Sequence, residues 1–222
     1  SMSYQGKAIN FEAELESILE DYNIELSETL SFKSLYQILA IVNISALATN
    51  RYYEIENFVL KSYNILKDKK DTEKQLFYQI HIVYIIANTL FRNKKFEASL
   101  SYIQEMEELM KLKKGIYQKE FILKKTLVEA LNYNYLNNQN KAIDLVEQVI
   151  KKKHSDIEAL LDLHLSLLMF HFQKEDFSKA KSVLAKFYHT DQYYIEKAGI
   201  DWVIKKNLAE ILLYIELNED DL

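Results

Sequence analysis

The sequence predicts an all-α protein built from antiparallel pairs of helices. Three observations support this prediction. Proline is absent and only three glycines occur in 222 residues. The residues that form the turns of sheets and barrels, and the phosphate-binding loops, are therefore scarce. Apolar residues recur at spacings of three and four along most of the chain, as in helices with one buried face. A similar five-residue connecting segment also returns every 38–45 residues.

The periodicity divides the chain into ten expected helices. In one of them, Leu76, Ile80 and Val83 share a single face. The expected helices cover residues 8–21, 31–48, 52–67, 72–92, 95–112, 116–136, 139–153, 155–173, 177–188 and 191–217.

Residues that can cap helix starts support several of these boundaries. Ser155 followed by Glu158 has the spacing of a capping box, in which each side chain bonds a backbone N–H group at the helix start. Asn138, Asp176 and Asp191 each precede or open another expected helix.

Lysines gather near the ends of alternate expected helices, as in Lys111, Lys113 and Lys114 and again in Lys151 to Lys153. The partial negative charge of a helix C-terminus favours cations there, which gives these lysines a structural explanation. A basic edge that faces a ligand is the other interpretation.

The recurring connecting segments are Ala48–Tyr52, Arg92–Phe96, Tyr135–Gln139, Gln173–Phe177 and Asn218–Leu222. Their spacing is that of a helical repeat array, in which each repeat is one helix pair. The last repeat contains a first helix but no second one. We therefore expect the chain to be part of a longer protein.

Small residues also recur where paired helices must approach closely. Ala87 and Ala130 fall in first helices of the pairs, and Ser99, Ala142 and Ala180 fall in second helices. This pattern resembles the tetratricopeptide repeat. The resemblance implies one domain over residues 1–222, with an N-terminal helix within 1–30 and a right-handed α-solenoid of about four and a half repeats over 31–222.

The chain departs from the tetratricopeptide pattern in three respects. Its repeats exceed the usual length, the terminal proline is missing, and Lys95, Asn138 and Asp176 stand where the family has glycine. The stretch from Ala198 to Leu208 is also similar to repeat proteins of Bacteroidetes.

Composition excludes several classes of function. The chain has no cysteine, so disulfides, thiolate metal sites and cysteine nucleophiles are excluded. The net charge of −5 gives no reason to expect binding to nucleic acid or an anionic membrane, and no secretory signal is evident, so we expect a cytoplasmic protein. The sequence contains no phosphate-binding, zinc-protease or nucleophile-elbow motif, and we expect no enzyme activity and no cofactor.

Two histidines share one helix face, His164 and His171. Seven residues of helix separate them by about 10 Å, which is too far for both to bind one metal ion. We therefore expect no metal site and interpret both histidines as partly buried and hydrogen-bonded.

The resemblance also indicates a binding surface. The inner wall of a tetratricopeptide groove is formed by first helices, and the matching polar and aromatic residues are His81, Tyr84, Asn88, Lys124, Asn134 and Asp162. The sequence therefore predicts a scaffold that binds a protein or peptide partner in a groove. The alternatives are a peptide-sensing domain of a bacterial transcription regulator, a partner surface on the outer faces or the lysine edge, and self-association.

Overall fold

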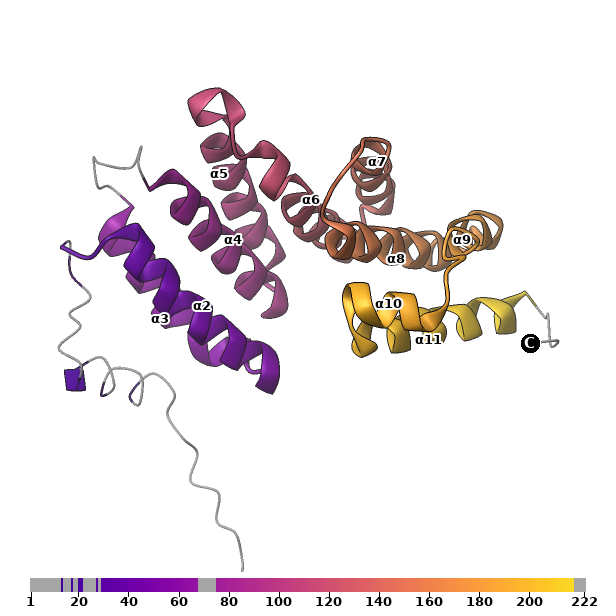
Figure 1. The fold of residues 1–222 in the computed structure, drawn as a ribbon, viewed down its shortest axis with the longest axis horizontal. Coiled ribbons are helices and arrows are strands. Elements are labelled where there is room, and N and C mark those ends of the chain that lie inside the picture. Colours follow the sequence, from indigo (N-terminus) through magenta and orange to yellow (C-terminus); the bar gives the residue numbers. More distant parts are fainter. Residues whose placement is uncertain are drawn as a thin grey trace, which may run out of the picture. The chain divides into compact units, whose positions relative to one another are not determined.

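The computed structural model describes residues 29–67 and 75–217, together with residues 13, 17, 20, 21 and 27. Within these residues the regular structure consists of ten helices, and no strand occurs. Within each compact unit most helices that follow one another pack together and run antiparallel, for example α2 with α3 and α7 with α8 (Figure 1). The all-α prediction is thus confirmed, while the expected helix 8–21 lies almost entirely outside the described residues.

The chain divides into two compact units, residues 1–109 and residues 110–222. In unit 1, α2 (Phe32–Thr49) packs against α3 (Tyr52–Leu66) and α4 (Leu76–Arg92), and α3 also packs against α4. The core between them contains fully buried aliphatic and aromatic side chains, including Leu35, Leu39, Ile55, Tyr63 and Ile80.

α2 is long and apolar enough to cross a membrane, and within the described residues it is the one helix of that kind. Core helices of soluble proteins have the same properties. Five of its residues are buried, and the helix packs against α3 and α4. Exposed apolar side chains, among them Ile41, Ile44 and Leu47, lie on the remaining surface of α2.

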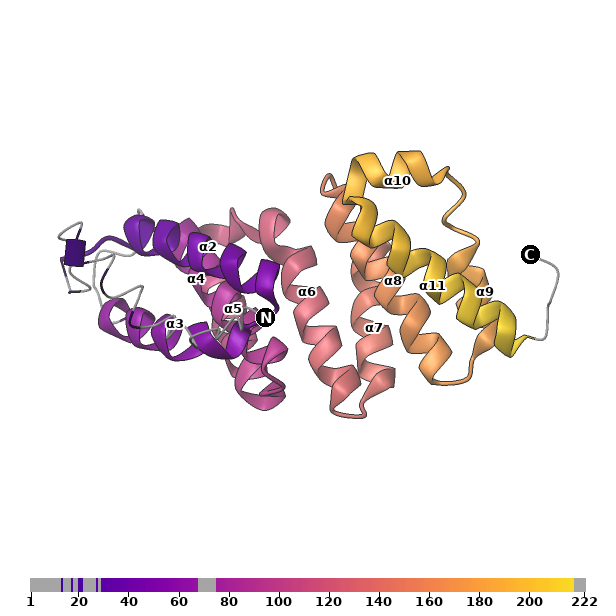
Figure 2. The same cartoon turned by 90° about the horizontal axis from the view of Figure 1, so that it is seen from below.

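Unit 2 is organised around α8 (Figure 2). Its helices are α6 (Gln118–Tyr135), α7 (Gln139–Ile150), α8 (Ile157–Gln173), α9 (Phe177–Leu184), α10 (Asp191–Ala198) and α11 (Ile200–Glu216). Each of the other five packs against α8, and their shared core includes Leu163, Leu168, Phe170, Val146 and Trp202. α8 is therefore the helix on which surface features of this unit are positioned.

α5 (Phe96–Gly115) loses helical geometry before its assigned end. Leu112 is extended, with ψ of 159°, and Lys113 and Lys114 have φ of 49° and 61°. The helix thus ends near residue 112, as the sequence predicts.

Four of the predicted connecting segments share one backbone geometry. The third residue of each has a positive φ between 54° and 61°, and these residues are Asn50, Lys94, Asn137 and Glu175. The N–H of the next residue bonds the carbonyl oxygen five positions earlier, as in Lys95 N to Leu90 O at 2.9 Å and Asn138 N to Tyr133 O at 2.8 Å. These bonds are those of a helix stop in which one left-handed residue reverses the chain. The fifth segment, residues 218–222, lies outside the described residues.

Two of the four predicted caps are confirmed and two are displaced by one residue. Asn138 and Asp176 accept hydrogen bonds from the N–H groups of Lys141 and Lys179. Asp156, not Ser155, caps α8, and Thr190, not Asp191, caps α10.

The displaced caps have physical reasons. Asp156 has the extended backbone that a cap needs and accepts from Ala159 N at 3.0 Å. The Asp191 carboxylate is occupied elsewhere, because it accepts hydrogen bonds from Lys206 and Asn207 of α11, and these two bonds lower its pKa.

The expected helix 191–217 is wrong in one respect: it is two helices, α10 and α11. Gly199 separates them with φ of 87° and ψ of 165°, a conformation that glycine adopts readily and other residues rarely do. α10 consequently packs against α11, and Tyr194 lies 5.1 Å from Trp202 between ring centroids.

The predicted close approach of paired helices is confirmed at every alanine tested. Ala87, Ala130, Ala142 and Ala180 are each 0% exposed. Ser99 is also fully buried. Because a larger side chain would find no free space at these positions, they fix how near neighbouring helices can lie.

Candidate functional site

Three of the predicted groove residues lie in unit 1, on α4. His81 is half-buried, and its ring lies 4.8 Å from Tyr36 and 4.7 Å from Phe77 between ring centroids. Tyr84 and Asn88 are also half-buried and follow His81 at spacings of three and four. The three side chains therefore share a helix face that begins in an aromatic cluster.

The other three predicted groove residues lie in unit 2. Lys124 of α6 and Asp162 of α8 are half-buried, whereas Asn134 is 8% exposed. The Asn134 side-chain N–H donates to Gln173 Oε1 at 2.8 Å, which joins the C-terminal ends of α6 and α8. Asn134 thus has a structural hydrogen bond in addition to its predicted role.

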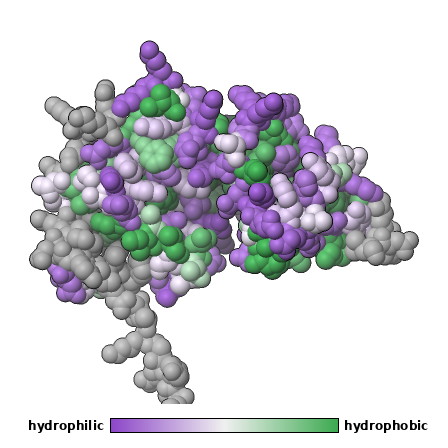
Figure 3. All heavy atoms as spheres, in the orientation of Figure 1, coloured by the Kyte–Doolittle hydropathy of each residue, from purple (hydrophilic) through white to green (hydrophobic). Residues whose placement is uncertain are grey.

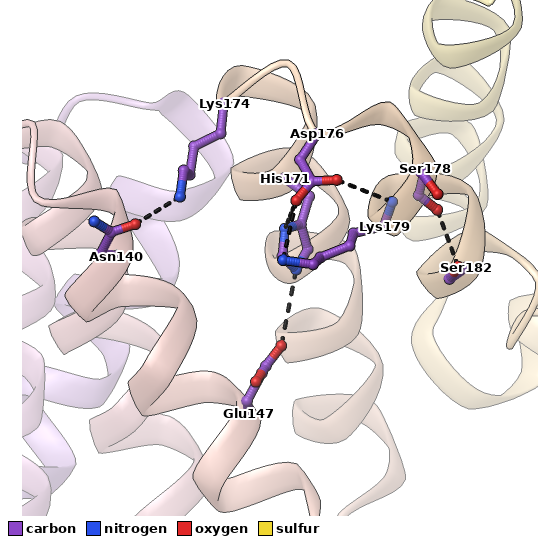
Figure 4. Close-up of polar contacts among 8 residues, drawn as sticks. All are labelled: Asn140, Glu147, His171, Lys174, Asp176, Ser178, Lys179 and Ser182. Carbon is purple, nitrogen blue, oxygen red and sulfur yellow. Dashed lines mark hydrogen bonds and ion pairs between the residues drawn. The ribbon is translucent and has the colours of Figure 1, made fainter.

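A pocket of about 450 Å³ lies in unit 2 among α7, α8 and α9. We call it the lysine pocket. It combines charged, polar and apolar side chains from the three helices and from the residues that follow α7 and α9: Glu147, Ile150, Lys151, His164, Leu167, His171, Lys179, Ser182, Val183 and Lys186. Figure 4 shows part of this wall, with His171 between Glu147 and Asp176.

His171 is the buried polar group of the lysine pocket. Its ring is 3% exposed, with Nε2 3.9 Å from Glu147 Oε1 and Nδ1 4.0 Å from Asp176 Oδ2. Both distances are longer than hydrogen bonds, and Nδ1 has no hydrogen-bond partner among the described residues. A buried polar atom without a hydrogen-bond partner lowers the stability of the fold.

The charge state of His171 follows from its surroundings. Burial lowers the pKa of His171, Lys179 and Lys174 lower it further, and Asp176 and Glu147 oppose the shift. The ring is therefore neutral at pH 7 and can offer one donor and one acceptor.

Local sequence explains how Lys179 reaches the pocket. Asp176 caps α9, and the Lys179 ammonium lies 3.1 Å from Asp176 Oδ2, an ion pair that lowers the pKa of Asp176. Lys179 remains 66% exposed. The turn thus places a lysine at the pocket mouth and holds it near His171 (Figure 4).

A second, more apolar pocket of about 240 Å³ adjoins the first. The two pockets share His164 and Lys186. The other lining residues are Ile157, Leu160, Leu161, Phe187, Tyr188, His189, Tyr193 and Tyr194. Because its walls are mostly aromatic and aliphatic, this aromatic pocket suits an apolar side chain.

His164 lines both pockets. Its Nδ1 lies 2.9 Å from the backbone carbonyl oxygen of Leu160, so Nδ1 carries the proton in a hydrogen bond to that oxygen. Burial lowers the pKa of His164, and Lys186 lowers it further. The prediction of a partly buried, hydrogen-bonded histidine is confirmed for His164. It is wrong for His171, which is fully buried and makes no hydrogen bond to the described residues, because α7 and α9 cover its face of α8.

Sequence reasoning found part of this site. It placed His164 and His171 on one helix face and named Lys151 within a possible ligand-facing edge. It did not bring Lys179 and Lys186 to the same pocket, because their positions depend on how α9 packs against α8. Within the described part of the chain, no group of three or more histidine, aspartate and glutamate side chains could hold a metal ion.

Comparison of the chain with protein-family models, with curated proteins and with solved structures gives no match.

Proposed function

We propose that this protein is a non-catalytic binding module for an acidic segment of another protein, which it holds in the lysine pocket. The observation that supports this most directly is that Lys151, Lys179 and Lys186 line one pocket together with the buried His171. Lys179 lies in α9, Lys151 directly follows α7 and Lys186 lies two residues beyond α9, so the ligand would contact a surface formed by tertiary packing.

The charge of the pocket differs in sign from that of the chain. With both histidines neutral, three lysines face Glu147 and the Asp176 carboxylate that pairs with Lys179, which leaves a local excess of one positive charge, whereas the chain as a whole has a net charge of −5. A local positive patch on an acidic protein attracts an anionic group to that place and repels it elsewhere. This difference favours recognition of acidic side chains over general affinity for polyanions.

Apolar side chains in the pocket add a second contact. Ile150, Leu167 and Val183 lie among the lysines, and they would pack against the methylene groups of a glutamate or the backbone of an extended segment. Because the walls are helices, little ordering of the receptor is needed on binding.

The hydroxyl group in the pocket supports a binding role. Ser182 donates to the backbone carbonyl oxygen of Ser178 at 2.9 Å, within its own helix. A serine nucleophile instead needs a hydrogen bond to a general base such as histidine. The geometry of Ser182 therefore gives no support to acyl transfer.

Peptide selection tests the proposal. Random peptides displayed on phage are selected on the immobilised chain, and the affinity of an enriched peptide is measured by fluorescence anisotropy. We expect enrichment of aspartate and glutamate. The double variant Lys151→Glu/Lys186→Glu should weaken binding about tenfold or more, because two attractive charges become repulsive.

A matched variant controls for net charge. Lys152→Glu/Lys153→Glu makes the same change in charge at neighbouring exposed positions that do not line the pocket. It should leave the affinity within about twofold. Equal loss in both variants, or selection of peptides without acidic residues, would contradict the proposal. If Tyr84→Ala/Asn88→Ala instead abolished binding, the partner would occupy the α4 face.

A further inference from the structure

The aromatic pocket and the lysine pocket follow one another along a single face of α8. The residues of this face are spaced by three and four: Ile157, Leu160, Leu161, His164, Leu167 and His171. The first three line the aromatic pocket, the last two line the lysine pocket, and His164 lines both. The two pockets are therefore consecutive parts of one groove.

α9 and the residues that follow it form a second wall of this groove. Lys179, Ser182 and Val183 of α9 line the lysine pocket. Residues 187–189 line the aromatic pocket, and Lys186 lines both. Each wall thus changes from one pocket to the other at a single residue, which is His164 on α8 and Lys186 after α9.

The two parts of the groove differ in chemistry. Lys151 and Lys179 line only the lysine pocket, whereas the walls of the aromatic pocket are mostly rings and aliphatic side chains. Among the described residues, no aspartate or glutamate lines the aromatic pocket. Figure 3 shows a similar mixture at the surface of unit 2, where green apolar patches lie among purple hydrophilic residues. A groove of this kind suits a segment that is acidic at one point and apolar at another.

Contacts with the core hold the aromatic pocket in shape. The Phe187 ring lies 5.4 Å from Trp202 and 6.1 Å from Tyr194 between ring centroids, in both cases edge to face. The backbone N–H of His189 donates to the Tyr194 hydroxyl oxygen at 3.3 Å, and the His189 ring stacks on Tyr193 at 4.1 Å. The walls are therefore positioned by the fold, and little ordering of them is needed on binding.

The size of the aromatic pocket fits one side chain. Its volume is about 240 Å³. A cavity of about 150 Å³ is enough for a benzene ring, and pockets for whole small molecules usually begin at about 300 Å³. An aromatic occupant would also gain ring-to-ring contacts with Phe187 and Tyr193 that an aliphatic one would not.

We infer that the aromatic pocket is a second subsite, into which the segment bound in the lysine pocket inserts one aromatic side chain. The inference rests on the proposed function of the lysine pocket. It adds the feature by which the protein distinguishes one acidic segment from another, because lysines alone would bind any of them.

The groove also sets the distance between the two ligand side chains. Leu160 and Leu167 lie near the middle of the two parts of the α8 face, and seven residues of helix separate them by about 10 Å. An extended segment covers about 3.3 Å per residue. The aromatic residue should therefore stand two to four positions from the acidic residue.

A peptide series tests this on the unmodified chain. Each peptide carries two adjacent glutamates and a phenylalanine three positions before or after them, and its matched control has alanine in place of phenylalanine. By fluorescence anisotropy, one of the two phenylalanine peptides should bind roughly tenfold more tightly than its control. Moving the phenylalanine about ten positions away, beyond the reach of the pocket, should remove the gain.

A pair of variants assigns the gain to the aromatic pocket. Leu161→Gln places an uncharged polar group in the pocket wall, so it should remove most of the gain from phenylalanine and leave the alanine peptide within about twofold. Leu208→Gln makes the same change on α11, outside both pockets and at a residue that is 56% exposed, and should leave both affinities unchanged. Circular dichroism checks that both variants are folded.

Photochemical cross-linking locates the side chain without any change to the protein. A phenylalanine analogue with a diazirine group replaces phenylalanine in the tighter peptide, and mass spectrometry identifies the labelled residues. We expect labels within residues 157–164 and 186–194. Labels that all lie outside these two ranges would overturn the inference.

The outcomes separate this inference from the proposed function. Equal affinity of the phenylalanine and alanine peptides would overturn the aromatic subsite and leave the lysine pocket as proposed. Equal loss of the gain in Leu161→Gln and Leu208→Gln would also overturn it. If no peptide with glutamates binds, the proposed function fails and the subsite fails with it.

Discussion

Ser99 of α5 donates its hydroxyl hydrogen to the backbone carbonyl oxygen of Ala87 in α4, at 2.7 Å, and both residues are completely buried. A side chain as short as serine can reach the backbone of the next helix only where two helices lie very close together. The pair therefore measures how tightly α4 and α5 pack, and it leads to the first prediction.

Enlarging residue 99 should destabilise unit 1 more than removing its hydroxyl. We expect Ser99→Ala to lower the free energy of unfolding by about 1 kcal/mol, the usual net value of one hydrogen bond. Ser99→Leu should cost more, roughly 1–3 kcal/mol from overpacking in addition to the lost bond. Urea denaturation followed by circular dichroism measures both. Equal stability of the leucine variant and the original chain would show that the helices can separate without cost.

The buried alanines of unit 2 should respond in the same way. Ala142→Leu and Ala180→Leu each place three extra heavy atoms where exposure is 0%, and each should cost roughly 1–3 kcal/mol. Ala185→Leu is the control, because Ala185 is exposed at the end of α9 and should tolerate the change. Melting temperatures by calorimetry compare the three variants. Similar melting temperatures in all three would contradict the tight packing of α7 and α9.

Acid should destabilise unit 2 through His171. Burial holds the pKa of His171 below its ordinary value of 6.5, so below that pH the unfolded chain binds a proton that the folded chain does not. The stabilising contribution of the neutral ring is therefore complete above about pH 6.5 and is lost as the pH falls toward the folded-state pKa.

Replacing the ring tests this pH dependence. Between pH 7.5 and 5.5 the urea midpoint of the unmodified chain should fall more than that of His171→Gln. The midpoint of His164→Gln should also fall less than that of the unmodified chain, because burial also lowers the pKa of His164. Midpoints that fall equally in all three chains would assign the acid sensitivity to other groups.

Glycine should stabilise the turns that end helices. Lys94 and Glu175 have φ of 61° and 60°, a conformation that costs residues with a Cβ atom about 1 kcal/mol. Lys94→Gly and Glu175→Gly should therefore raise the free energy of unfolding by roughly 0.5–1 kcal/mol, whereas Asn137→Gly should gain less because asparagine tolerates this region. Chemical denaturation compares the three. A loss of stability in both Lys94→Gly and Glu175→Gly would mean that side-chain contacts outweigh backbone strain.

The sequence was most informative where local chemistry decides the structure. Turn residues and small residues follow from spacing, which is why Ala142, Ala180 and the four turns were predicted correctly. The capping errors at Ser155 and Asp191 arose where two neighbouring residues could both cap, and the choice depends on backbone dihedrals and on contacts with α11. The lysine pocket, in contrast, depends on how the helices pack against one another. Lys151, Lys179 and Lys186 meet because α7 and α9 pack against one helix, and spacing along the chain gives no measure of that.

The conformation of Gly199 also sets where α10 holds Tyr193 and Tyr194, which form one side of the aromatic pocket. A methyl group at this position would meet no atom within 4 Å, so the effect of Gly199→Ala comes from the backbone alone. Alanine strongly favours the helical region, and a helical residue 199 would join α10 to α11 in one straight rod. Tyr194 would then swing away from Trp202, and the aromatic pocket, which Tyr193 and Tyr194 of α10 line, would open on that side. The backbone conformation of a single glycine thus fixes the position of the aromatic rings that α10 contributes to the pocket.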